Sequence, residues 1–136
     1  MLAAPMLGAC APSPAQVPEP PAMLASSAEY GFGDTIAAAD QAALAHVIDL
    51  LAPRYGSPQV TRYVARAGAD LGQLRTYYDA RANAAGWQAI GDVQGVLSLR
   101  ENAIAYSSGS SAFAVVWIAP RTDSPAVPVN VVRFDR

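Results

Sequence analysis

Residues 70–87 carry the clearest helix signals in the chain and constrain the fold more than any other stretch. Asp70 is a residue type favoured at helix N-caps, and Gln73 follows it at the spacing of a capping box. Gly86 stands where a helix commonly ends with a left-handed residue. The apolar residues between them recur at helical spacing, namely Leu71, Leu74, Tyr78, Ala82 and Ala85. This stripe predicts a helix that packs on a sheet or on another helix.

The first helix in chain order is predicted from Asp34 or Thr35, either of which can cap it, to about residue 51, so the helix at 70–87 is the second. Its apolar residues also recur at helical spacing, namely Leu44, Val47, Ile48 and Leu51. Pro53 is expected to end this helix, because proline removes a backbone donor and clashes with the preceding turn.

The other segments are expected to be extended, and they are residues 60–64, 87–90, 96–99, 103–106, 112–119 and 127–134. The run 112–119 is continuously apolar, which predicts a central strand buried on both faces. Pro128 cannot donate to a ladder, which places the last strand at an edge of the sheet or Pro128 near its start. Together the segments predict an α+β fold: two helices packed on one face of an antiparallel sheet of about four or five strands.

The N-terminal region has a different composition from the rest of the chain. A tetrad of small and apolar residues ends in the single cysteine, namely Leu7, Gly8, Ala9 and Cys10, and a proline-rich segment follows. The tetrad resembles the lipobox of bacterial lipoproteins. That resemblance implies that Cys10 is lipidated and anchors the chain to a membrane of the cell envelope, facing the periplasm or the outside. The region before Cys10 is short and has no basic residue, so either the true start lies upstream of Met1 or the match is due to chance.

These features predict three segments. Residues 1–9 are interpreted as a truncated signal-peptide-like segment and residues 10–33 as a proline-rich tether, since proline makes a linker extended and stiff. Residues 34–136 are expected to form the globular α+β domain.

Composition argues against several classes of site. The formal net charge is −2, and the nine basic residues form no stripe, so nucleic acid is not an expected partner. One histidine and one cysteine cannot supply the usual four ligands of a structural zinc site, and a single cysteine cannot form an intrachain disulfide. We therefore predict no metal site and no cofactor.

No catalytic residue is predicted. His46 is expected on the exposed face of the first helix, where Asp49 could contact it, and no partner serine or cysteine is identifiable. The serine and glycine residues at 107–111 are typical of a turn. Arg75 and Asp79, four residues apart on the second helix, are expected to form a solvated ion pair.

The aromatic residues remain as candidates for a binding surface. Core packing is expected for most of them, and the candidates for contact with a ligand or partner are Tyr77, Trp87 and Trp117, the first two ahead of the third. The leading hypothesis is a lipid-anchored cell-envelope protein with a non-enzymatic domain that binds an envelope protein or a glycan. One alternative is a small soluble hydrolase or ligand-binding enzyme around His46, Asp49 or the aromatic residues. Another is a structural subunit of an envelope complex that uses strand 127–134 as an edge.

Overall fold

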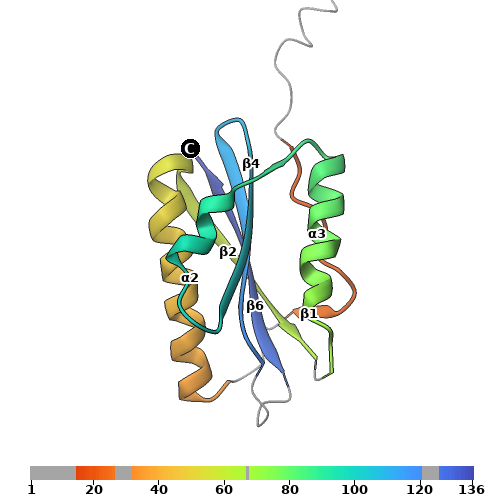
Figure 1. The fold of residues 1–136 in the computed structure, drawn as a ribbon, viewed down its shortest axis with the longest axis vertical. Helices are drawn as coiled ribbons and strands as arrows, with labels where there is room; N and C mark the ends of the chain where they lie inside the picture. The colour runs from red at the N-terminus through yellow and green to blue at the C-terminus, as the bar shows by residue number, and fades with distance from the viewer. Residues whose placement is uncertain (1–14, 27–31, 67, 121–125) are drawn as a thin grey trace, which may run out of the picture.

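A computed structural model describes residues 15–26, 32–66, 68–120 and 126–136 (Figure 1). Cys10 and the rest of the lipobox-like tetrad lie outside these residues. The described elements are β1 (Leu24–Ser26), α2 (Asp34–Tyr55), β2 (Ser57–Ala65), α3 (Gly72–Ala84), β3 (Gln88–Ala89), the 3₁₀ helix η1 (Gly91–Val96), β4 (Glu101–Ser108), β5 (Ser111–Ile118) and β6 (Val127–Asp135).

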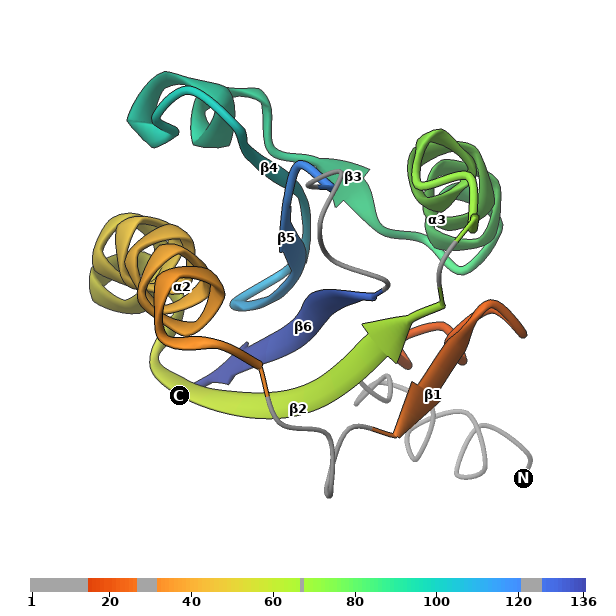
Figure 2. The ribbon, with the colours of Figure 1, turned by 90° about the horizontal axis from the view of Figure 1, so that it is seen from below.

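The described strands form one antiparallel sheet of six strands in the order β1-β2-β6-β5-β4-β3. The predicted α+β class is therefore confirmed, while the predicted number of strands was too low. Figures 1 and 2 show α2 and α3 on opposite sides of the curved sheet, not on one face as predicted. The alternation of side chains along β5 explains this arrangement, because this strand is buried along nearly its whole length and offers one apolar set of residues to each face of the sheet.

The sheet face under α2 is lined by small residues. Asn130 of β6 contacts Asp40 of α2, and alternation from Asn130 places a set of buried alanines on the same face, namely Ala103, Ala105, Ala112 and Ala114. Because alanine is short, α2 can approach the sheet closely, above all at β5 and β6, and bury Val47 and Leu51 completely. Among the described helices, α2 alone is long and apolar enough to cross a membrane by length and composition. Four of its apolar residues are buried, namely Ala43, Leu44, Val47 and Leu51.

The end of α2 differs from the prediction. The helix runs through Pro53 and ends at Tyr55, followed by Gly56 with a positive φ of 107°. The Gly56 N–H donates to the carbonyl of Ala52 at 2.9 Å. Pro53 lies in the last turn, where its missing N–H removes only one late helical hydrogen bond, so the helix tolerates it.

The opposite face of the sheet is lined by aromatic residues. Phe113 of β5 lies at the centre of this group, and its ring centroid is 6.0 Å from Tyr78, 4.9 Å from Trp87 and 5.0 Å from Tyr106. Tyr78 comes from α3 and Trp87 from the segment just after it, so their large side chains fill the space between α3 and the sheet. Phe113 therefore joins α3 to the sheet.

The predicted ends of α3 are confirmed in part, because the helix begins at Gly72 with Leu71 as its N-cap residue and the predicted capping box with Gln73 does not form. The Asp70 carboxylate accepts a hydrogen bond from the Gly72 N–H at 3.0 Å, and Gly86 has a φ of 91°. The predicted stripe is buried except for Ala85, which is exposed. The chain reverses after Gly86 and directs Trp87 back over the helix end. There the backbone N–H of Trp87 donates to the carbonyl of Ala82 at 2.9 Å.

The edge position offered for the last strand and the strand predicted at 96–99 were wrong, whereas Pro128 does lie near the start of β6, as the other alternative predicted. β6 is an interior strand between β2 and β5, so it does not provide the edge required by the structural-subunit alternative. Pro128 is tolerated because the pairing of β6 with β5 begins only at the next residue, Val129, opposite Trp117. Residues 96–99 form the end of η1 and a turn instead of a strand, and the Gln94 side chain ties η1 to β4 by donating to the carbonyl of Ala103 at 2.7 Å.

Candidate functional site

Residues 15–21 cross the aromatic face of the sheet, and we call this segment the strap. The indole Nε1–H of Trp87 donates to the carbonyl of Gln16 at 2.9 Å, and the Tyr77 hydroxyl donates to the carbonyl of Glu19 at 2.5 Å. Pro21 is buried, and the chain continues from it into β1, which pairs with β2. In its described residues, the predicted tether therefore lies on the domain.

The composition of the strap suits this position. Its prolines favour an extended backbone and carry no N–H that would need a partner, while their neighbours' carbonyls remain free to accept hydrogen bonds. From the sequence, these prolines are expected to prevent helix and sheet up to about residue 25. That expectation fails at Leu24, where β1 begins and the side chain is buried.

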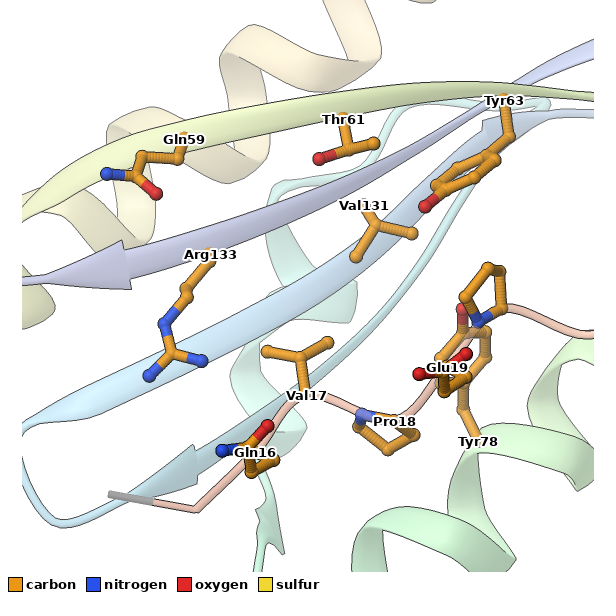
Figure 3. A pocket seen from close by; sticks show the side chains of 11 residues that line it. Gln16, Val17, Pro18, Glu19, Gln59, Thr61, Tyr63, Tyr78, Val131 and Arg133 are labelled. Carbon is orange, nitrogen blue, oxygen red and sulfur yellow. The ribbon is translucent and has the colours of Figure 1, made fainter. Parts of the chain in front are cut away.

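A pocket of about 380 Å³ lies between the strap and the sheet (Figure 3). Its sheet side is formed by alternate residues of β2 and their register partners on β6, namely Gln59, Thr61, Tyr63, Val131 and Arg133. α3 covers β4 and β5 but not this half of the sheet (Figure 2). The pocket is therefore lined by polar side chains, with Arg133 and Glu19 among them, beside a smaller apolar surface, which suits a ligand held by hydrogen bonds.

The charges at the pocket are largely compensated. The Arg133 Nε–H donates to a carboxylate oxygen of Asp135 at 2.7 Å. This hydrogen bond is the main reason that the pKa of Asp135 is lowered from its usual value. Glu19 of the strap is exposed. The pocket consequently shows no strong preference for a charged ligand.

Tyr78 contributes an unusual hydroxyl to the pocket. Its side chain is fully buried, and the hydroxyl has no hydrogen-bond partner among the described residues. Burial raises the pKa of Tyr78 strongly, and the nearby phenols of Tyr77 and Tyr63 raise it further. A buried hydroxyl without a partner costs free energy, and such groups are found where a ligand or another function requires them.

The Tyr78→Phe substitution is expected to raise the free energy of unfolding by about 1 kcal/mol, because it removes the unpartnered hydroxyl and keeps the ring. Chemical denaturation of the wild type and the variant measures this change. Tyr106→Phe is the matched control, since its hydroxyl donates to Asp79 and its loss should destabilise the protein. A loss of stability in Tyr78→Phe equal to that of the control would show that the hydroxyl has a partner.

The three residues predicted to contact a ligand or partner differ in their burial and in what they contact. Trp87 and Trp117 are only 2% and 5% exposed, so neither indole forms an open binding surface. Tyr77 is half-buried, with the Arg81 guanidinium 4.6 Å from its ring centroid. Tyr77 and Trp87 do contact an extended peptide segment, but that segment is the chain's own strap, and Trp117 does not line the pocket.

Sequence reasoning missed the polar residues of the pocket. Gln59, Thr61 and Tyr63 alternate along β2 with Val60 and Arg62, and this period of two is visible in the sequence. The pattern shows that three polar side chains share one face. It does not show that the strap lies opposite them, because that contact joins segments about forty residues apart.

His46 has a partner that the sequence analysis did not predict. Its Nδ1 lies 2.8 Å from Oε1 of Glu101, whereas Asp49 was the expected contact. Glu101 also accepts from the Ser98 N–H at 2.8 Å, so the carboxylate is held in place and can orient the imidazole. Within the part of the chain that the structure describes, His46 lines neither the pocket under the strap nor a smaller pocket of about 150 Å³ beside Glu101. Among the described residues, no group of three or more side chains could hold a metal ion.

The predicted ion pair on α3 is replaced by a longer-range contact. Asp79 accepts a hydrogen bond from the hydroxyl of Tyr106 on β4, which links α3 to the sheet beside Phe113. Comparison of the chain with protein-family models, with curated protein sequences and with solved structures finds no match.

Proposed function

We propose that this chain is a lipid-anchored cell-envelope protein whose domain binds another envelope component at the pocket under the strap. The observation that carries this proposal is the attachment of the strap to Tyr77 and Trp87, which makes the segment after the lipobox-like cysteine the roof of a polar pocket. The anchor and the binding site would therefore belong to one continuous segment.

The strap also determines how far the domain would stand from a membrane. Ala15, the first described residue of the strap, follows Cys10 by five residues. Five residues span at most about 18 Å when fully extended. A lipid on Cys10 would hold the domain at the bilayer surface, close enough to reach a component embedded in or lying on the membrane.

The pocket supports the binding part of the proposal. A volume of about 380 Å³ is within the range of small-ligand sites. Its donors and acceptors come from two strands of a six-stranded sheet, so the sheet side of the pocket is rigid. The Tyr78 hydroxyl supplies a buried group with unused hydrogen-bonding capacity.

The Cys10→Ser substitution is expected to abolish membrane attachment. When the full reading frame is expressed in a bacterial host, we expect wild-type Cys10 to carry a lipid and to form the mature N-terminus. Each buried methylene of an acyl chain contributes about 0.8 kcal/mol to membrane binding, so the lipid should move the protein to the membrane fraction. Intact-mass spectrometry and fractionation measure both effects. Ser13→Ala is the matched control and should leave the lipid in place, whereas wild-type protein with unmodified Cys10 and residues 1–9 retained would contradict the proposal.

A further inference from the structure

The strap is held in the way that polyproline II segments are recognised. Its two hydrogen-bonded carbonyls, of Gln16 and Glu19, are three residues apart. A polyproline II helix has three residues per turn, so the carbonyls of residues i and i+3 point in the same direction. Both accept from aromatic side chains, those of Trp87 and Tyr77. Grooves for proline-rich peptides are likewise lined by aromatic residues, and they use the low entropic cost of the preformed backbone.

The strap does not fill the groove that it occupies. The space of about 380 Å³ remains between it and β2 and β6. Val17 is the strap side chain directed toward β6 in Figure 3, and it cannot form a hydrogen bond with the polar residues around it. The buried hydroxyl of Tyr78 stays without a partner at this place. A longer, hydrogen-bonding side chain in place of Val17 would extend further into this space and bring a hydrogen-bonding group toward Tyr78, which lines the same pocket.

We propose that this groove is a receptor for a proline-rich segment of another protein, and that the strap is an internal competitor for it. The partner segment is extended, presents two carbonyls three residues apart to Trp87 and Tyr77, and carries a glutamine-like side chain at the position of Val17. The placement of the partner in the cell envelope rests on the proposed function. The chemistry of the groove is independent of lipidation at Cys10, so the binding experiment below and the test of Cys10 can fail separately.

The experiment titrates the full chain with two synthetic peptides. The first has the sequence of residues 15–26, AQVPEPPAMLAS, and the second is the same peptide with the Val17→Gln change. A chain with the Pro18→Ala and Pro20→Ala substitutions is compared with the wild type, because alanine loosens the strap and leaves the groove unchanged. The Trp87 indole N–H resonance, assigned with Trp87→Phe, reports binding. We expect the proline-substituted chain to bind either peptide about tenfold more tightly than the wild type, since a tethered competitor reduces apparent affinity.

Two receptor variants test the individual contacts. In the proline-substituted chain, Tyr77→Phe should weaken both peptides about fivefold, because it removes one donor and keeps the ring. The glutamine peptide should bind about fivefold more tightly than the valine peptide, and Tyr78→Phe should remove this difference alone.

Three results would overturn the proposal. The first is failure of the proline-substituted chain to bind either peptide. The second is equal binding of a peptide with all its prolines replaced by alanine, which would show that the extended proline-rich backbone is not recognised. The third is a dimer of the wild type that forms without peptide and is lost in Tyr77→Phe, since it would assign the groove to the strap of a second copy.

Discussion

The Phe113→Ala substitution is expected to lower the free energy of unfolding by about 4 kcal/mol and to release the strap from the domain. Phe113 is fully buried, and its ring contacts those of Tyr78, Trp87 and Tyr106. Alanine would leave a cavity between α3 and the sheet, where three large rings cannot all move to fill it. Trp87 would lose its edge-to-face neighbour and no longer present its Nε1–H to Gln16 at the observed 2.9 Å.

Chemical denaturation and the Trp87 indole N–H resonance measure the two effects of this change. Phe113→Leu is the first control, and it should cost less because more of the volume is retained. Val60→Ala is the second, since Val60 is 39% exposed and its truncation should change stability by less than about 1 kcal/mol. If Phe113→Ala cost no more than Val60→Ala, Phe113 would not be the residue that joins α3 to the sheet.

The elements with strong local signals were predictable from the sequence. The Asp70 cap, the apolar stripe and Gly86 all act within one helix, and the structure places α3 between the expected ends. The continuous apolar run at 112–119 correctly predicted a central strand buried on both faces, because only such a strand needs apolar residues at every position. The helix depends on interactions between residues close together in the sequence, and the strand was predictable from its burial alone.

The arrangement of these elements was not predictable in the same way. The order of strands and the faces that receive α2 and α3 depend on pairings such as β2 with β6, which join residues about seventy positions apart. Pro128 lies near the start of β6, which is one of the two positions predicted for it, and β6 can be an interior strand because β5 begins to pair with it one residue later. A rule about one residue cannot identify which neighbouring strand needs its N–H.

The candidate site was predictable only in part. Tyr77 and Trp87 were predicted to contact a ligand or partner, and in the structure both donate hydrogen bonds to the chain's own strap. The prolines of the strap were interpreted as a spacer because they prevent helix and central-strand formation. The same prolines also prepare a backbone for recognition, and only the positions of the two aromatic donors distinguish the two roles.

Substitution of the buried polar residues on the sheet face under α2 is also expected to change stability strongly. The Asn130→Asp substitution is expected to lower the free energy of unfolding by about 3 kcal/mol at pH 8. Asn130 is 1% exposed, and its Nδ2 donates to a carboxylate oxygen of Asp40 at 2.7 Å, while Asp40 is 3% exposed. Arg62 donates to the other oxygen of Asp40 at 3.2 Å, but its side chain is 52% exposed. Two carboxylates in contact would share this one partly solvated cation.

The pH dependence of Asn130→Asp follows from the same contact. Burial already raises the pKa of Asp40 in the wild type, against the lowering effects of Asn130 and Arg62. In the variant, one of the two carboxylates must hold a proton, so the pKa of the pair is raised above its value in the unfolded chain. The folded state then binds more protons than the unfolded state between those pKa values, and stability falls as the pH rises through this range. We expect the variant to regain most of its lost stability as the pH is lowered from 8 toward 4.

Denaturation curves at several pH values provide the measurement, and an exchange of the two residues provides the control. The double variant Asp40→Asn with Asn130→Asp again places one amide against one carboxylate, so it should recover most of the stability at pH 8. If the single variant were as stable as the wild type at every pH, Asp40 and Asn130 would not be in contact in the folded protein. If the single variant loses stability and the double variant recovers it, the contact between the side chains of residues 40 and 130 is what the exchange restores. This buried pair would then be shown to hold α2 on the face of the sheet opposite the strap.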